Sequence, residues 1–301
     1  MAIRPMFYAI HLWFNGMIAI VTYWRCLIKL RIKKMKKNLL LLLFSAIFIP
    51  IIIPLKAHAL DITIGATTWY AQSEQSYIQN KSDNGIIENS VIKSDPAFLY
   101  GPTLAVRLSS NFNLTFVYLY GTFDTTQDDG SYISKSRYSR SDSDIALNYR
   151  LNDYFKVFIG AKYLSYDITP AKTDLFYFDI QEIDVHTSYG SGLGFSATLP
   201  VIGNLFCLGT VSGLYLWGSH SVVAGDRNGN NPQSENLKYN EYGFNSTLSL
   251  AYYIAPASVV VSLGGRFQYL IADYNKNSIY LDVVKFTIWG ATLTATYTFS
   301  I

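Results

Sequence analysis

The chain has 301 residues, of which 50% are hydrophobic and 16% aromatic, and its formal net charge is +3. It contains two cysteines, which excludes a disulfide-rich scaffold. The charge is uneven, because nine of the 24 basic residues but none of the 21 acidic residues precede Leu60. From Leu60 onward the net charge is −6, which argues against a nucleic-acid partner.

The segment over residues 35–59 has the layout of a secretory signal peptide. Two lysines at 36–37 precede an uncharged apolar stretch over 39–55, and the small-x-small triplet at 57–59 follows it. A basic region, an apolar core and such a triplet predict cleavage after Ala59. Two prolines inside the stretch would break a helix that stayed in the mature protein. An uncleaved anchor is the alternative.

A second apolar stretch lies further upstream, over residues 6–24, and a basic cluster follows it. Because residues 35–59 form a complete signal on their own, we interpret residues 1–34 as a spurious extension and place the translation start at Met35. A tandem membrane helix before the signal is the alternative. In either case the functional domain is expected to span residues 60–301.

The part of the chain after Ala59 shows the period-two alternation of β-strands. In "DIALNYRL" (144–151) and "TLTATYTFSI" (292–301), apolar residues alternate with small, polar or charged ones. Aromatic residues gather near the segment ends on the apolar face. An apolar outer face, a polar lumen and aromatic girdles are typical of a transmembrane barrel, whose sheet edges must close in lipid. A soluble periplasmic barrel or lipid carrier is the alternative.

Ten such segments are predicted, and eight to twelve strands stay open as the range. They cover residues 60–71, 97–108, 113–123, 132–151, 154–166, 186–199, 205–217, 241–253, 259–270 and 284–301. Short and long connections alternate between them, as in a closed up-and-down antiparallel β-barrel with short periplasmic turns and long extracellular hairpin loops. Alternation that continues toward Asp129-Gly130, a turn dipeptide, predicts that the third and fourth strands project above the membrane.

Three segments depart from simple alternation. Residues 205–217 are apolar on both faces and cannot be oriented from the sequence. In the last segment, Phe286 and Ile288 are out of phase with the apolar residues from Trp289 onward, which predicts a bulge or a crossing of the barrel rim. In "GSGLGF" (190–195), glycines on the lumen face are expected to make room for large side chains opposite.

These features together resemble Gram-negative outer-membrane β-barrel proteins over residues 60–301. The features are the signal peptide, the ten alternating segments and a C-terminal strand with Phe299 near its end. The resemblance implies a location in the outer membrane, contact with its lipid, and recognition of the last strand by the barrel insertion machinery. In that class the last strand often ends in Phe or Trp, whereas Phe299 lies two residues before the end. The extracellular ligand is unknown.

Charged residues on the polar faces predict a charge network in the lumen. Opposite charges in a narrow barrel pair with one another and plug it. The predicted network residues are Arg107, Arg150, Lys156, Lys162, Glu241 and Arg266.

Two Asp residues in "SDSD" and an Asp-x-His pair in "DVH" are placed on the inner face near the outer ends of their strands: Asp142, Asp144, Asp184 and His186. This set resembles the catalytic set of the omptin proteases, in which carboxylates and a His activate a water. Omptins place their pairs on facing walls, whereas these pairs lie two strands apart. We interpret them as further members of the charge network, and expect no catalytic residue, cofactor or metal site.

The expected function is that of a non-enzymatic outer-membrane barrel acting through its extracellular loops, in surface recognition, adhesion or membrane integrity. A narrow passive pore for small solutes is the alternative, because some small barrels keep an open lumen. An omptin-like surface protease is the third interpretation.

Overall fold

The computed structural model describes residues 60–81, 86–128, 133–170, 181–225, 233–274 and 283–301. The segments assigned above to residues 1–34 and 35–59, and the Asp129-Gly130 hairpin tip, lie outside these ranges. Within the described residues, no helix has the length and apolar character needed to cross a membrane. The strands are β1 (Asp61–Lys81), β2 (Ile86–Lys93), β3 (Ala97–Arg107), β4 (Phe112–Asp128), β5 (Ile133–Arg150), β6 (Phe155–Pro170), β7 (Gln181–Ile202), β8 (Leu205–Gly225), β9 (Gln233–Ile254), β10 (Val259–Asp273) and β11 (Val283–Ser300).

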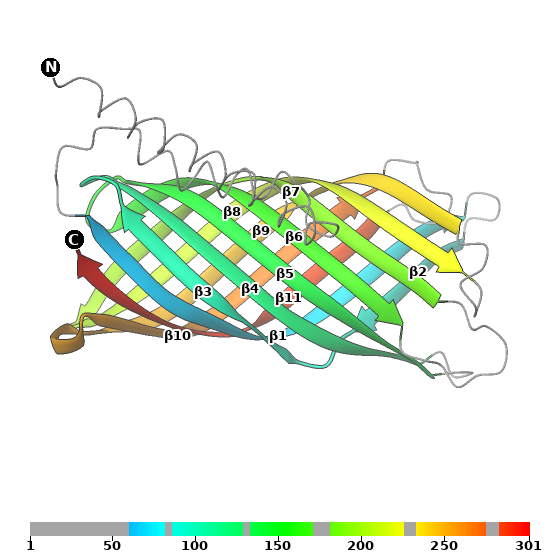
Figure 1. Cartoon of the computed structure of the whole chain (residues 1–301), viewed down its shortest axis with the longest axis horizontal. Helices are drawn as coiled ribbons and strands as arrows, with labels where there is room; N and C mark the ends of the chain where they lie inside the picture. The colour runs from blue at the N-terminus through cyan, green and yellow to red at the C-terminus, as the bar shows by residue number, and fades with distance from the viewer. Residues whose placement is uncertain (1–59, 82–85, 129–132, 171–180, 226–232, 275–282) are drawn as a thin grey trace, which may run out of the picture. The chain divides into compact units, whose positions relative to one another are not determined.

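The eleven strands form one closed antiparallel barrel with ten strand positions. Consecutive strands pair with each other around the sheet, and β11 pairs with β1 from Asp61↔Ser300 to Ile78↔Val283 (Figure 1). Strands β2 and β3 share one position in the barrel, because both pair with β1. β2 pairs with residues 74–81 of β1, and β3 pairs with residues 62–71. The predicted ten-stranded up-and-down barrel is therefore confirmed.

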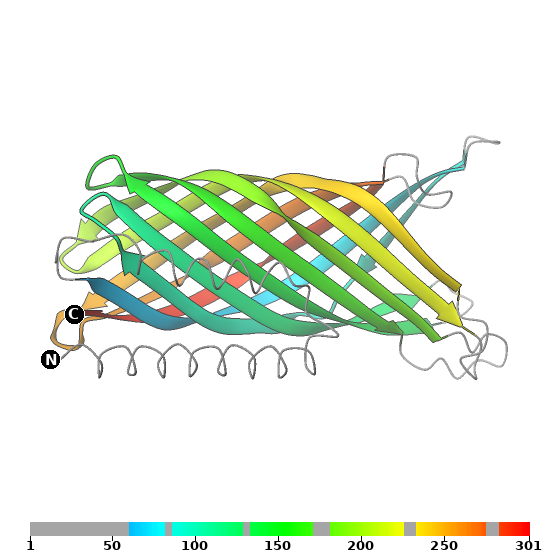
Figure 2. The ribbon, with the colours of Figure 1, turned by 45° about the horizontal axis from the view of Figure 1, so that its top comes forward.

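The two ends of the barrel differ in their connections. At one end, which we call the turn end, the strands are joined over residues 108–111, 151–154, 203–204 and 255–258. Two of these turns contain a left-handed residue, Gly203 with φ 54° and Ser258 with φ 52°. The other connections meet at the opposite, loop end (Figure 2). In outer-membrane barrels the short turns face the periplasm and the loop end faces outward.

The strands extend further toward the loop end than the sequence predicted. Strands β7 and β9 have 22 residues each, and β1 and β8 have 21. The projecting part is therefore built by much of the barrel, and not by the third and fourth predicted strands alone. Several outward-facing residues in the added parts are polar, for example Lys238 and Asn240 of β9. Without an outer apolar face, these parts lack the alternation by which strands are recognised.

Two girdles of aromatic side chains surround the outer surface. The girdle nearer the loop end includes Tyr70 and Phe98, with ring centroids 4.8 Å apart. The girdle nearer the turn end includes Phe112 and Tyr149, with centroids 5.1 Å apart. Exposed aliphatic side chains lie between them, namely Ile64, Leu104, Leu147, Ile159, Leu193, Leu248, Leu250, Leu263 and Leu293. This is the lipid-facing surface of a transmembrane barrel.

The spacing of the girdles matches the thickness of a membrane. Tyr242 and Tyr252 are both exposed on β9 and lie ten positions apart. At a rise of about 3.4 Å per residue and a tilt of about 45°, they are separated by about 24 Å along the barrel axis. The apolar band of such barrels is about 25 Å tall. The part of the barrel beyond Tyr242 therefore projects out of the apolar layer at the loop end.

Placing a charge between the girdles is expected to destabilise the barrel strongly. Leu248 is 65% exposed in the lipid-facing band. Leu248→Arg should lower the free energy of unfolding from lipid vesicles by about 2–4 kcal/mol, because arginine is costly at the bilayer midplane. Asn240→Arg, on the same face of β9 beyond Tyr242, is the matched control and should cost no more than about 1 kcal/mol. Equal losses in the two variants would contradict this placement of the membrane.

The bulge predicted in the last strand is absent, and the change of phase falls where the strand passes the outer girdle, in line with the alternative of a rim crossing. β11 pairs with β10 and with β1 without a register shift. Phe286 and Ile288 face the interior and are buried, whereas Trp289 and Leu293 face outward. The change of phase reflects an apolar interior near the loop end and an apolar exterior in the membrane. The described barrel has its irregular register in β7, between Pro200 and Ile202.

The same arrangement explains β8, which is apolar on both faces. Val211, Tyr215 and Trp217 are exposed toward lipid, whereas Leu216 is fully buried inside the barrel. The inner apolar side chains of β8 therefore have two locations: Leu216 lies in the packed interior, and Leu208 and Leu214 line the cavity below it.

Candidate functional site

A layer of ten side chains closes the lumen near the outer girdle. Each of the ten strand positions contributes one inward-facing residue that is at most 1% exposed. Neighbours such as Asp142↔Leu164 and Leu164↔Ser188 are direct cross-strand partners, while other pairs are staggered because the strands tilt. We call this layer the septum, and its members are Trp69, Leu99, Leu119, Asp142, Leu164, Ser188, Leu216, Glu241, Gln268 and Ile288.

Buried aromatic and aliphatic side chains fill the interior on the loop side of the septum. Phe123 stacks on Tyr138 with ring centroids 4.9 Å apart, and Tyr166 stacks on Phe286 at 5.2 Å. We call this region the upper core, and its other apolar members include Ala71, Leu237, Tyr239, Leu270, Ala272, Tyr274 and Val284. The projecting half of the barrel is therefore packed like the interior of a soluble protein.

A charge cluster crosses the lumen at the septum. Asp142 of β5 accepts hydrogen bonds from Arg140, at 3.0 Å, and from Lys162 of β6. Arg266 of β10 lies 3.6 Å from the same carboxylate. Arg140 is fully buried and also donates to Tyr166, at 2.6 Å, and to Gln268 of β10. The cluster therefore ties one wall of the barrel to a distant one.

Two aromatic rings hold the cations of this cluster in place. The guanidinium of Arg266 lies over the ring of Trp69, 4.7 Å from its centroid, and that of Arg140 lies over Tyr166 at 4.8 Å. Cation–π contacts of this kind gain strength when they are desolvated. They link the polar part of the septum to its apolar part.

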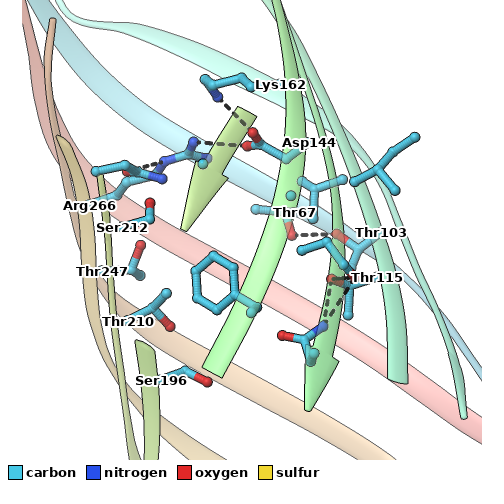
Figure 3. Close-up of a pocket in the computed structure, with 18 of the residues that line it drawn as sticks. Thr67, Thr103, Thr115, Asp144, Lys162, Ser196, Thr210, Ser212, Thr247 and Arg266 are labelled. Atoms are coloured by element: carbon cyan, nitrogen blue, oxygen red, sulfur yellow. Dashed lines mark hydrogen bonds and ion pairs between the residues drawn. The ribbon is translucent and has the colours of Figure 1, made fainter. Parts of the chain in front are cut away.

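A cavity of about 460 Å³, lined by hydroxyl-bearing and apolar side chains, lies on the turn side of the septum. Its walls carry the hydroxyl groups of Thr67, Thr103, Thr115, Ser196, Thr210, Ser212 and Thr247 (Figure 3). The Thr67 hydroxyl lies within hydrogen-bond distance of Thr103 and Thr294, at 2.8 and 2.9 Å. We call this cavity the vestibule. Asp144, Lys162 and Arg266 form its roof.

Three further cations surround the mouth of the barrel at the turn end. Arg107, Arg150 and Lys156 line a small pocket of about 170 Å³, which shares Asn148 with the vestibule. Arg107 pairs with Asp61 at 2.6 Å, and Arg150 pairs with Asp153. The mouth therefore lies next to the vestibule, on its turn side, and its arginine side chains are exposed to solvent.

The predicted network residues divide between these two places. Lys162, Glu241 and Arg266 lie at the septum. By contrast, the structure places Arg107, Arg150 and Lys156 together at the mouth. The plug is mostly apolar and aromatic, because charge pairs occupy one layer of it and hydrophobic side chains fill the volume above.

Three of the four residues compared with the omptin set have described side chains, and these lie in two different places. Asp142 and Asp144 both contact Lys162, and Asp142 is 1% exposed. His186 lies in the upper core, stacked on His220 with ring centroids 3.8 Å apart. Asp184 belongs to β7, but its side chain lies outside the described residues. Asp142 and His186 are therefore both engaged in packed, buried surroundings.

Sequence reasoning missed Arg140, the cation at the centre of the cluster. Alternation offered a signal, because Arg140, Asp142 and Asp144 occupy every second position of β5 and so share the inner face. Gln268 was missed because its contact with Arg140 joins strands that are far apart in sequence, whereas Tyr166 is the cross-strand partner of Arg140 on the next strand. The expected role of the lumen glycines is confirmed at Gly194, where a Cβ atom would lie 2.2 Å from the ring of Phe158.

Within the described residues, no group of three or more His, Cys, Asp or Glu side chains is arranged to hold a metal ion.

No family model matches the chain, and no curated protein sequence matches it. Solved structures are similar to it. The outer-membrane protease OmpT of Escherichia coli matches 82% of this chain and 99% of its own, with 12% identity and a TM-score of 0.56. The translocator domain of the autotransporter NalP of Neisseria meningitidis matches 85% and 94%, with 10% identity and a TM-score of 0.46. The outer-membrane protein AlkL matches 83% and 96%, with 13% identity and a TM-score of 0.39.

The closed ten-position barrel, its two girdles and the likeness to the fold of OmpT define the class: the chain has the fold of an outer-membrane β-barrel protein. At 12% identity the likeness to OmpT concerns the fold alone.

Proposed function

We propose that this protein is a non-enzymatic outer-membrane barrel that acts at the cell surface through its projecting half. It serves in recognition, in adhesion or in maintaining the membrane, and it does not conduct solutes. This proposal rests on the closed septum. Each of the ten strand positions contributes one side chain to it, and none of these side chains is more than 1% exposed. A packed barrel that extends beyond the membrane is a rigid support for the connections at its loop end.

The septum also bears on the two alternative functions. A passive pore needs a continuous polar path, and the vestibule ends at the septum and the upper core. A surface protease needs a carboxylate or imidazole that can reach substrate and water. Asp142 is held by cations, and His186 is 4% exposed. Both observations favour a structural role for these residues.

The proposal predicts a silent barrel whose loop end mediates surface binding. Purified protein in planar bilayers should show no conductance steps, because the septum leaves no water-filled path. Cells that express the protein should adhere better than cells with an empty vector. Shortening the β4–β5 hairpin to the level of Gly121 and Arg140, which are cross-strand partners, should reduce that gain. Steady conductance by the wild type, with adhesion unaffected by the hairpin, would support the pore instead.

A further inference from the structure

The vestibule is a chamber with one entrance. The septum bounds it toward the loop end. From there its lining continues toward the turn end, from Arg266 to Ser262 on β10 and from Leu214 to Leu208 on β8. It shares Asn148 with the pocket at the mouth. Solutes therefore reach it from the turn end, which is the periplasmic end in this class of barrel. Its volume of about 460 Å³ falls within the range of small-molecule sites.

The walls of the vestibule suit a ligand that carries hydroxyl groups. Thr, Ser and Asn side chains line it on most of the strands, and each hydroxyl can both donate and accept a hydrogen bond. Their methyl groups, together with Phe158 and Leu214, add apolar surface of the kind that packs against a carbon ring. Most ligand sites combine such apolar walls with a few convergent polar groups.

The roof of the vestibule contains Arg266, whose guanidinium group makes only long contacts with the neighbouring carboxylates. Arg266 donates through Nε to Asn245, at 3.3 Å, and through Nη2 to Asp144, at 3.5 Å, and it lies 3.6 Å from Asp142. Charge-assisted hydrogen bonds to a carboxylate are about 2.7–2.9 Å long. Lys162 contacts Asp144 at 2.8 Å and so compensates its negative charge. The guanidinium therefore keeps donors for a ligand carboxylate that approaches from the vestibule.

The charges at the mouth favour an anion. Arg107 and Arg150 each pair with one carboxylate, whereas Lys156 appears in none of the ion pairs formed by the described residues. The mouth thus holds three cations against Asp61 and Asp153. A surplus positive charge at this entrance raises the local concentration of anions, and salt screens the effect because the arginines are exposed.

We infer that the vestibule is a binding site for a small hydroxylated carboxylate of the sugar-acid class, which enters from the periplasmic end. Lys156 and its two arginine neighbours attract the anion, Arg266 receives the carboxylate, and the Thr and Ser hydroxyls bind the hydroxyl groups. The septum makes the site a closed pocket, so the ligand is held and is not passed across the membrane.

Calorimetric titration of the full barrel in lipid nanodiscs with D-glucuronate tests this assignment. The wild type should bind D-glucuronate at least about threefold more tightly than neutral D-glucose, and the difference should shrink in high salt. Lys156→Gln should weaken D-glucuronate binding by a factor of about two to five, since one partly screened charge is lost. Lys238→Gln, which removes an exposed lysine on the outer face of β9, is the control and should leave the affinity unchanged.

A second pair of variants tests the place of binding. Thr103→Phe with Thr210→Phe fills the vestibule from opposite walls and should abolish binding of D-glucuronate. Thr68→Phe with Val211→Phe makes the same addition on the lipid-facing side of β1 and β8 and should leave binding intact. The heat-modifiable gel shift verifies that each variant is folded. No binding by the wild type, or binding that survives the filled vestibule, would overturn the site, and equal affinity for D-glucose would overturn its assignment to anions.

Discussion

Asp142→Asn is expected to lower the free energy of unfolding by about 3–5 kcal/mol, because it leaves buried cations without their shared counter-charge. Asp142 is 1% exposed and contacts Arg140, Lys162 and Arg266. Asparagine has the same shape but carries no charge, so the loss reports electrostatics more than packing. Equilibrium unfolding in urea from lipid vesicles, followed by tryptophan fluorescence, measures the difference.

Two comparisons make this prediction specific. Asp124→Asn removes one partner of the exposed pair with Arg137, whose atoms lie 2.7 Å apart, and should cost no more than about 1 kcal/mol. Adding Lys162→Met to Asp142→Asn should restore part of the lost stability, because one of the uncompensated cations is removed as well. A loss near 1 kcal/mol for Asp142→Asn alone would show that water reaches this cluster.

Hollowing the septum is expected to turn a silent barrel into a conducting one. Trp69 and Leu99 are cross-strand partners in the septum, and Phe123 lies in the upper core. The residues next to them on the inner face, Ala71 and Ala97, are small. Replacing Trp69, Leu99 and Phe123 with alanine should therefore open a path along this wall, and discrete conductance steps should appear in planar bilayers.

The control for this variant removes apolar side chains from the lumen below the septum, without affecting closure. Val117, Leu208 and Leu214 line the vestibule below the septum, so their triple alanine variant should stay silent. Each large-to-small change in the packed upper region should also cost about 2–5 kcal/mol of stability. Silence of the folded hollowed variant would show that the rest of the upper core closes the lumen without the septum.

The sequence carried the information about the wall of the barrel. Alternation in segments such as 144–151 and 292–301 marked the strands, and the short turns between them indicated the topology. It did so because every second residue of a membrane-spanning strand faces lipid and must be apolar. This requirement is local and periodic. Where the outward face is polar, as at Lys238 and Asn240, that signal ends, and the strands were predicted too short.

Which side chains contact one another inside the barrel depends on the tertiary structure. Arg140 and Tyr166 are cross-strand partners on the consecutive strands β5 and β6, but Gln268 comes from β10, and only the tilt and closure of the barrel bring it to Arg140 across the lumen. For the same reason the sequence analysis assigned Lys156 and Lys162 to one network. The structure places Lys156 at the mouth and Lys162 at the roof of the vestibule. The alternation of one strand determines which face a side chain takes. The stagger between strands determines which side chains meet, and that stagger is a property of the closed sheet as a whole.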